Sequence, residues 1–257
     1  MRDESYHSQL SLSVIVPIYN EIGTLDAALR GLFHVLDQSR FSNLQIIIVE
    51  SNSTDGSREL LLDLKNHFNF RLILQQKPNG KGSAVREAFR YVTEDWILLF
   101  DADLEYDPND IRKLVEVART NKFDFIIGSR HNSNNFIRNM SNHKLRALAM
   151  NIAHLFFAWL INVRIRTNLR DPFSMYKFFR WSLFSKIVLT SDRFDLDWEL
   201  VILAGRMKSR FIEIPVKYTS RGFSEGKKIR FIRDPLNWLC AYVKHSTRQI
   251  DNSNEYL

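Results

Sequence analysis

The chain has 257 residues, of which 45% are hydrophobic and 25% charged, and its formal net charge is +7. This is ordinary composition for a soluble globular chain, and the length suffices for one large α/β domain with a sizeable core. The single cysteine, Cys240, excludes an internal disulfide framework, and residues 1–13 lack the apolar core of a secretory signal. The excess of positive charge favours an anionic partner, which could be nucleic acid, a membrane surface or a phosphorylated substrate.

The first 130 residues alternate between predicted strands and helices. Short β-branched or aromatic runs predict strands at 12–18, 44–50, 70–76, 95–101 and 123–129, and apolar residues at helical spacing lie between them. This alternation predicts a mostly parallel sheet covered by helices on both faces. Ligands collect at the carboxyl ends of the strands in such sheets. Asn20, Ser51, Asp101 and Arg130 all fall just past the ends of predicted strands.

Residues 147–163 contain no Asp, Glu, Lys or Arg, which is at the short limit for a membrane span. Asn151, His154 and Asn162 make the segment a poor span, so we expect a buried or interfacial helix. Further along, the pattern predicts a helix at 195–207, a strand at 210–218, a basic loop at 219–230 and a last helix that opens near Pro235. No repeat or linker is visible, which indicates one continuous domain over 1–257.

Three other motif classes receive little support. The segment "NGKGSAV" at 79–85 fits neither a P-loop nor GxGxxG, so it predicts a turn and a helix start. The seven histidines and one cysteine show no zinc-binding spacing. Basic segments with interleaved aromatics occur, but no nucleic-acid module pattern accompanies them, and we expect no nucleic-acid partner.

The stretch "WILLFDADLEYDP" at 96–108 sets an apolar run against alternating acids. Asp101, Asp103 and Glu105 would project to one side for as long as strand geometry persists. Crowded carboxylates repel one another unless a cation lies among them. Oxygen ligands of this kind suit Mg²⁺ or Mn²⁺, which often bridge carboxylates to substrate phosphates. A solvated acidic turn is the alternative.

Five segments in order carry a family resemblance: "VIVPIYNE" at 14–21, "VESNSTDGS" at 49–57, "DADLEYDP" at 101–108, "GSRH" at 128–131 and "DPFSMYKFF" at 171–179. Together they resemble the family 2 glycosyltransferases, which have the GT-A fold. Within that family they are most similar to polyprenyl-phosphate (dolichol-phosphate) mannosyl- and glucosyltransferases. The resemblance covers residues 12–230 or so.

The resemblance implies roles for individual residues. The nucleotide sugar would contact Pro17, Tyr19, Glu21, Val49, Glu50, Ser51, Asp101, Ala102, Asp103, Arg221 and Lys227. The divalent ion, Mg²⁺ or Mn²⁺, would lie at Asp101, Asp103 and Glu105, and Arg130 would face the acceptor phosphate. Residues 12–130 would form the nucleotide-sugar-binding half, 131–232 the acceptor side, and 233–257 a C-terminal helix and tail.

The sequence also departs from the family pattern. The second strand usually ends in Asp-Asp but here ends in Glu50-Ser51, which leaves the choice between uracil and guanine open. The Gly that usually follows "DPxS" is Met175. A hydroxyl acceptor would need a general base, for which Asp195, Asp197 and Glu199 are candidates. Acids in the first turn of an amphipathic helix are the alternative reading of these three.

The implied activity is metal-dependent, inverting transfer of a hexose from a GDP- or UDP-sugar to a polyprenyl phosphate. The expected location is cytoplasmic, peripheral on the cytosolic face of a membrane, with Phe156, Phe157 or Trp159 against lipid. A membrane-anchoring partner or a homo-oligomer would be compatible with this. Two alternatives stay open: a soluble family 2 enzyme of glycan or polysaccharide synthesis with a hydroxyl acceptor, and a non-catalytic sugar-nucleotide-binding subunit.

Overall fold

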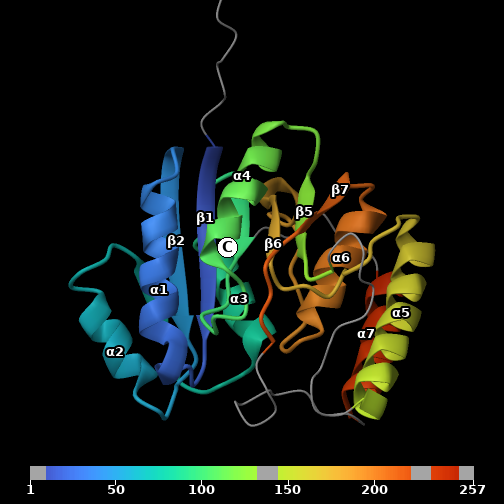
Figure 1. Ribbon diagram of the computed structural model, residues 1–257, viewed down its shortest axis with the longest axis horizontal. Helices are drawn as coiled ribbons and strands as arrows, with labels where there is room; N and C mark the ends of the chain where they lie inside the picture. The colour runs from blue at the N-terminus through green and yellow to red at the C-terminus, as the bar shows by residue number, and fades with distance from the viewer. Residues whose placement is uncertain (1–9, 132–143, 221–232, 249–257) are drawn as a thin grey trace, which may run out of the picture.

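The computed structural model describes residues 10–131, 144–220 and 233–248 (Figure 1). Its described residues form one seven-stranded sheet in the order β3-β2-β1-β4-β6-β5-β7. The strands are β1 (Leu10–Ile18), β2 (Phe41–Glu50), β3 (Arg71–Leu74), β4 (Trp96–Leu99), β5 (Phe125–Ser129), β6 (Lys177–Arg180) and β7 (Phe211–Pro215). Within this described sheet, only β6 runs antiparallel to its two neighbours, β4 and β5. The predicted mostly parallel sheet is therefore confirmed.

Helices cover both faces of this sheet (Figure 1). They are α1 (Ile22–Asp37), α2 (Ser57–Leu64), α3 (Lys81–Phe89), α4 (Ile111–Arg119), α5 (Lys144–Ile165), α6 (Leu196–Arg206) and α7 (Arg233–Thr247), with short 3-10 turns η1 (Pro108–Asp110) and η2 (Trp181–Leu183). Because strand side chains alternate, Val14 and Val16 pack into one core with α1 and α4, whereas Ile15 packs into the other with α3 and α6.

The apolar segment 147–163 lies within α5, which packs against α6 through a close approach. A Cβ atom on Gly205 of α6 would lie 2.4 Å from Cβ of Ile165, so only glycine permits this crossing. Phe157 of α5 is buried against Trp198 and Trp238. Among the described residues, no helix is both long and apolar enough to span a membrane.

The other side of α5 is exposed. Five large apolar side chains are about half exposed or more there, namely Ile152, Leu155, Phe156, Trp159 and Val163. Phe157 faces the core instead, so the expectation that it could lie against lipid is wrong. Phe156 and Trp159 are exposed, so a contact between these two side chains and lipid stays a prediction.

Candidate active site

Three chain segments meet at the carboxyl edge of the sheet. The amide of Ser51 donates to the carbonyl of Ile18 (2.9 Å), and the amide of Phe100 donates to the carbonyl of Ile15 (3.0 Å). The Thr24 hydroxyl in the first turn of α1 donates to the Ala102 carbonyl (2.8 Å). These bonds bring the segments after β1, β2 and β4 side by side, as expected of a ligand site in a parallel sheet.

The predicted nucleotide-binding residues of β1 and the start of α1 lie at this edge. Pro17 is partly buried within the sheet, and Tyr19 is 37% exposed just beyond β1. Glu21 precedes the first turn of α1, and its amide donates to the Ser57 hydroxyl (3.0 Å). These positions are compatible with the predicted nucleotide contacts, which stay predictions.

The predicted base and ribose residues at the end of β2 are mostly enclosed. Val49 and Glu50 are fully buried, and Ser51 is 4% exposed. Glu50 forms an ion pair with Arg58 and accepts the Ser53 amide (2.5 Å). The Glu50 carboxylate thus holds the loop after β2 in place.

Ser51 donates its hydroxyl hydrogen to the side-chain oxygen of Gln75 (2.8 Å). Gln75 in turn donates to Glu87 of α3 (2.6 Å). Because Ser51 is tied to Gln75, a ribose contact through its hydroxyl would have to share or replace that bond. The predicted role of Ser51 therefore remains open.

The acidic turn differs from its predicted geometry. β4 ends at Leu99, and Leu104 has a φ of 59°, a left-handed conformation that is costly for a residue with a branched side chain. The argument from strand alternation is therefore wrong beyond Leu99. Asp101 and Asp103 are partly exposed at the turn, whereas Glu105 accepts a hydrogen bond from the Tyr218 hydroxyl (2.8 Å).

Lys81 is a site residue that sequence reasoning missed. Its Nζ lies 2.5 and 2.6 Å from the two carboxylate oxygens of Asp101. Lys81 is the first residue of α3, where a cation is unfavourable next to the positive end of the helix dipole unless an anion compensates it. That unfavourable placement within "NGKGSAV" is the signal that could have identified it.

The start of α3 is fixed by contact with the segment before α6. The amide of Ser83 donates to the Asp192 carbonyl (3.1 Å). Cβ atoms on Gly80 and Gly82 would lie 2.4 Å from the Asp192 carbonyl oxygen and 2.3 Å from the Ser191 carbonyl oxygen, respectively. The two glycines therefore allow the backbones to touch, which places Lys81 beside Asp101.

Arg130, at the end of β5, forms a buried pair with Asp171. Its Nε and Nη2 donate to the two carboxylate oxygens (2.8 and 2.6 Å), and its amide also donates to Asp171 (2.9 Å). The guanidinium carbon lies 5.5 Å from the ring centre of Tyr218. Burial lowers the pKa of Arg130, but the charge and hydrogen bonds of Asp171, together with Tyr106 and Tyr218, raise it well above its ordinary value, so the side chain is charged.

Asp197 lies in the first turn of α6. It forms an ion pair with Lys177 of β6, and both side chains are almost fully buried. Burial raises the pKa of Asp197, while the charge of Lys177 and the weaker influences of Lys81 and Arg130 oppose that rise. Burial also lowers the pKa of Lys177. The neighbouring cations oppose protonation of this carboxylate and Lys177 binds it, so the role of Asp197 as a base stays a prediction.

Glu199 lies in a different setting. Its carboxylate accepts the amides of Thr190 (2.8 Å) and Ser191 (2.8 Å) and an ion pair from Arg248 (2.7 Å). Glu199 is fully buried, and its carboxylate accepts the backbone amides of the segment that packs against α3. This geometry favours a structural role for Glu199 rather than that of a general base. The predicted Arg221 and Lys227 lie outside the described residues.

The two half-buried carboxylates of the acidic turn fit a divalent ion. Asp101 and Asp103 supply hard oxygen donors at an open edge, and Mg²⁺ typically takes one or two protein carboxylates together with substrate phosphates. Lys81 binds both oxygens of Asp101, so an ion there would share or displace that ammonium, whereas Glu105 is turned to Tyr218, which donates to its carboxylate. Lys81 and Arg130 lie at this edge as members of ion pairs with Asp101 and Asp171, so each cation is balanced by a carboxylate until a ligand binds.

Comparisons with known proteins agree with this architecture. The model of the family described as "Glycosyl transferase family 2" matches residues 13–189. The chain is 27% identical over 228 residues to dolichyl-phosphate beta-glucosyltransferase of Saccharomyces cerevisiae, covering 82% of this chain and 67% of that protein. It is 27% identical over 225 residues to dolichol-phosphate mannosyltransferase of Pyrococcus furiosus, covering 85% and 59%.

A third relative is glycosyltransferase AglJ of Haloferax volcanii, 26% identical over 225 residues that cover 87% of this chain and 68% of that protein. Among solved structures, glucosyl-3-phosphoglycerate synthase of Mycobacterium tuberculosis, crystallised with Mn²⁺, UDP and glucosyl-3-phosphoglycerate, matches with a TM-score of 0.67 at 13% identity, over 93% of this chain and 81% of that one. This likeness shows the GT-A fold. The chain belongs to glycosyl transferase family 2 and is a glycosyltransferase.

Proposed function

We propose that the protein transfers a hexose from a nucleotide diphosphate sugar to a polyprenyl phosphate. The observation that carries this is the set of three ion pairs, Lys81–Asp101, Arg130–Asp171 and Lys177–Asp197, whose cations would bind the anionic groups of donor and acceptor. Relatives named for dolichyl and dolichol phosphate support the acceptor, although the chain spans only 59–68% of the lengths of the three relatives above.

On the donor side, Asp101 and Asp103 would hold Mg²⁺ or Mn²⁺. When bound, such an ion supplies Lewis-acid stabilisation of the negative charge that grows on a departing diphosphate. The Lys81 ammonium, which is paired with Asp101, would bind a diphosphate oxygen once the donor is present. Tyr19 and Glu21 would contact the nucleoside at the neighbouring edge, and Arg221 and Lys227 would bind the diphosphate from the other side.

On the acceptor side, Arg130 would bind the phosphate. Asp171 engages Nε and Nη2 of this guanidinium, and a guanidinium has five N–H donors, so Nη1 can reach a second anion. A phosphate acceptor is already anionic near neutral pH and needs positioning by cations rather than a strong base. Direct displacement by this phosphate would invert the configuration at the anomeric carbon.

A hydroxyl acceptor is the second candidate, because Asp197 is available as a base. Burial raises its pKa above the ordinary value, which would suit proton removal from a sugar hydroxyl. The candidates are separable by their products. A non-catalytic subunit would bind the sugar nucleotide and neither transfer nor hydrolyse it.

We also propose peripheral attachment to the cytosolic face of a membrane. Exposed apolar side chains occur on α5 and also on α7, where Leu239 is 45% and Val243 is 53% exposed. An apolar surface on a protein of net charge +7 fits an anionic lipid surface. Attachment there would bring a lipid-linked acceptor near Arg130.

The test is a donor panel of UDP- and GDP-hexoses, each assayed with a short polyprenyl phosphate and with a free oligosaccharide. Formation of a polyprenyl phosphate sugar from one donor supports the proposal. Transfer only to the oligosaccharide would establish the hydroxyl-acceptor alternative. Binding of a sugar nucleotide without transfer or hydrolysis would indicate the non-catalytic subunit.

A further inference from the structure

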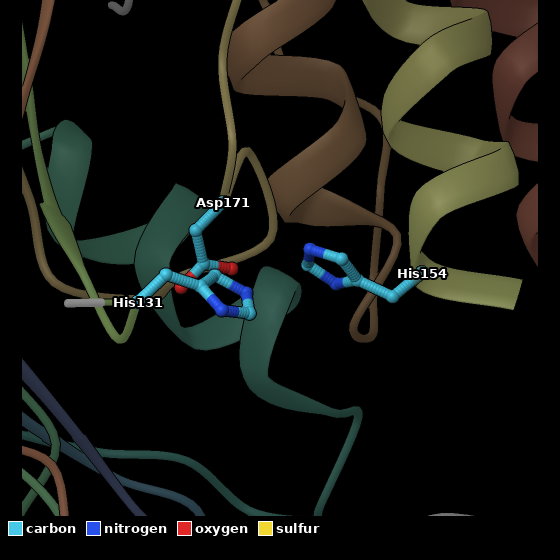
Figure 2. Close-up of side chains that lie close together, drawn as sticks. All are labelled: His131, His154 and Asp171. Carbon is cyan, nitrogen blue, oxygen red and sulfur yellow. The ribbon is translucent and has the colours of Figure 1, made fainter. Parts of the chain in front are cut away.

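Two histidines and an aspartate converge beside the acceptor side of the site, from three separate segments. His131 follows β5, Asp171 lies on the loop before β6, and His154 points towards them from α5 (Figure 2). One ligand atom from each lies within 4.8 Å of the other two, which makes this the one such group among the described residues. We propose that His131, His154 and Asp171 bind a second divalent metal ion of the Zn²⁺ class, separate from the ion of the acidic turn.

His154 is oriented as metal-binding histidines usually are. Its Nε2 lies 2.9 Å from the carbonyl oxygen of Arg170, so the imidazole donates its proton there and carries its lone pair on Nδ1. A backbone carbonyl that holds the far nitrogen of a histidine is the usual outer partner of a metal ligand. The rings of His131 and His154 lie 5.0 Å apart between centres, and one ligand atom of each lies within 4.8 Å of the other.

Asp171 is held equally firmly. Its amide and that of Arg170 donate to the two carboxylate oxygens of Glu213 on β7 (2.6 and 2.7 Å). The segment Arg170-Asp171 thus supplies the proposed ligand Asp171, and its Arg170 carbonyl orients the proposed ligand His154. A ligand set that is fixed by its own neighbours loses little conformational freedom when an ion binds.

The Asp171 carboxylate is shared with Arg130, which donates three hydrogen bonds to it, two of them to Oδ2. An ion at Oδ1 would therefore lie beside this pair and share or replace the bond from Nη2. Glu213 places a second carboxylate nearby through its bonds to the amides of Arg170 and Asp171.

The donor set identifies the class of ion. Two imidazoles and one carboxylate suit Zn²⁺ and its neighbours, whereas Mg²⁺ prefers oxygen donors alone. With Zn–N bonds of about 2.0–2.1 Å, tetrahedral ligands lie roughly 3.3 Å apart, so small rotations of the imidazoles would close the site. Three protein ligands leave one position open. A bound ion would fasten α5 to the loop before β6 and to the end of β5.

The experiment uses the untagged full chain carrying Asp103→Asn, which removes a ligand of the acidic turn. Metal-stripped protein is titrated with Zn²⁺, and with Co²⁺ as a spectroscopic probe of coordination. We expect one equivalent of tight binding and a visible Co²⁺ band of a four-coordinate site. His154→Gln and His131→Gln, checked for folding by circular dichroism, should each weaken the affinity at least roughly tenfold and abolish the band.

His67→Ala is the matched control, because His67 is exposed and follows α2, at the opposite end of the sheet from β5. It should bind Zn²⁺ as the parent does, and Zn²⁺ should raise the melting temperature of both but not of His154→Gln. Equal affinity in the His154→Gln variant would overturn the assignment, as would the absence of any stoichiometric binding in the parent. Neither readout depends on sugar transfer, so failure here is distinguishable from failure of the proposed function.

Discussion

The contact between Gly82 and the Ser191 carbonyl offers a quantitative test of how Lys81 is positioned. In Gly82→Ala, the new Cβ would lie 2.3 Å from that oxygen and 2.8 Å from the carbonyl carbons of Ser191 and Asp192. All of these atoms are backbone, so no side-chain rotation relieves the clash. Ordinary contact begins at 3.4 Å, so α3 and the Ser191 segment must separate by about 1.1 Å.

Such overpacking typically costs about 1–3 kcal/mol, which we expect as the loss in the free energy of unfolding, measured by urea denaturation. Lys81 is adjacent to Gly82 and would move with it. Because a misplacement of about 1 Å at a reacting centre can lower rates about 100-fold, we expect a loss of that order in sugar transfer. The assay is the initial rate of transfer at saturating donor.

Gly23→Ala is the matched control, since Gly23 also lies in the first turn of a helix and a Cβ atom there would meet no other atom within 4 Å. It should leave transfer unchanged and stabilise the fold by up to about 1 kcal/mol. If Gly82→Ala and Gly23→Ala behave alike in both measurements, the positioning of Lys81 through this contact is refuted.

Three further predictions follow from charge and exposure. Lys177→Met leaves the buried Asp197 carboxylate without its cation and should lower the free energy of unfolding by about 3–5 kcal/mol. This loss should shrink as the pH falls through the raised pKa of Asp197, because protonation neutralises the carboxylate. A loss independent of pH would contradict this. Trp159→Glu should weaken flotation with anionic liposomes at low salt, and unchanged flotation would remove α5 from the lipid surface. Arg221→Ala and Lys227→Ala should each lower transfer at least roughly tenfold, about 1.4 kcal/mol, and wild-type rates in both would exclude them from the donor site.

The parallel part of the fold was predictable because its strands are apolar runs of ordinary length. The sequence indicated all five strands of the first half at close to their observed positions. β6 was not predicted, because only four residues form it and two of them, Lys177 and Arg180, are charged. Its place between β4 and β5 depends on cross-strand pairing with Trp96 and Phe125, which no local pattern reveals.

The sequence predicted which candidate site residues follow the ends of strands, but it did not predict which side chains they contact. Asp101 and Arg130 follow apolar runs, so their positions could be inferred. Their partners could not, because Lys81 lies 20 residues from Asp101 in the sequence and Asp171 lies 41 residues from Arg130. Such pairs depend on how the loops cross the sheet edge, which spacing alone leaves undetermined.

The left-handed backbone of Leu104 shows why alternating acidic residues did not predict the course of the chain after β4. Alternation at Asp101, Asp103 and Glu105 looked like a continuing strand, yet the chain turns at Leu104 and directs Glu105 to Tyr218. No glycine or asparagine occupies the left-handed position, and the turn signal is Asp103, whose carboxylate accepts the amide of Glu105 two residues on (3.0 Å). The consequence for function is a smaller proposed ligand set, Asp101 and Asp103.

The most direct test of the central claim is transfer of hexose to a polyprenyl phosphate by the wild-type protein and by Asp103→Asn, each with Mg²⁺ or Mn²⁺ and with excess EDTA. Asn keeps an oxygen that can accept the Glu105 amide (3.0 Å in the wild type), so the variant should fold while losing a charged ligand. We expect product only with the wild type and a divalent ion. Full turnover in excess EDTA, or a wild-type rate for folded Asp103→Asn, would contradict it.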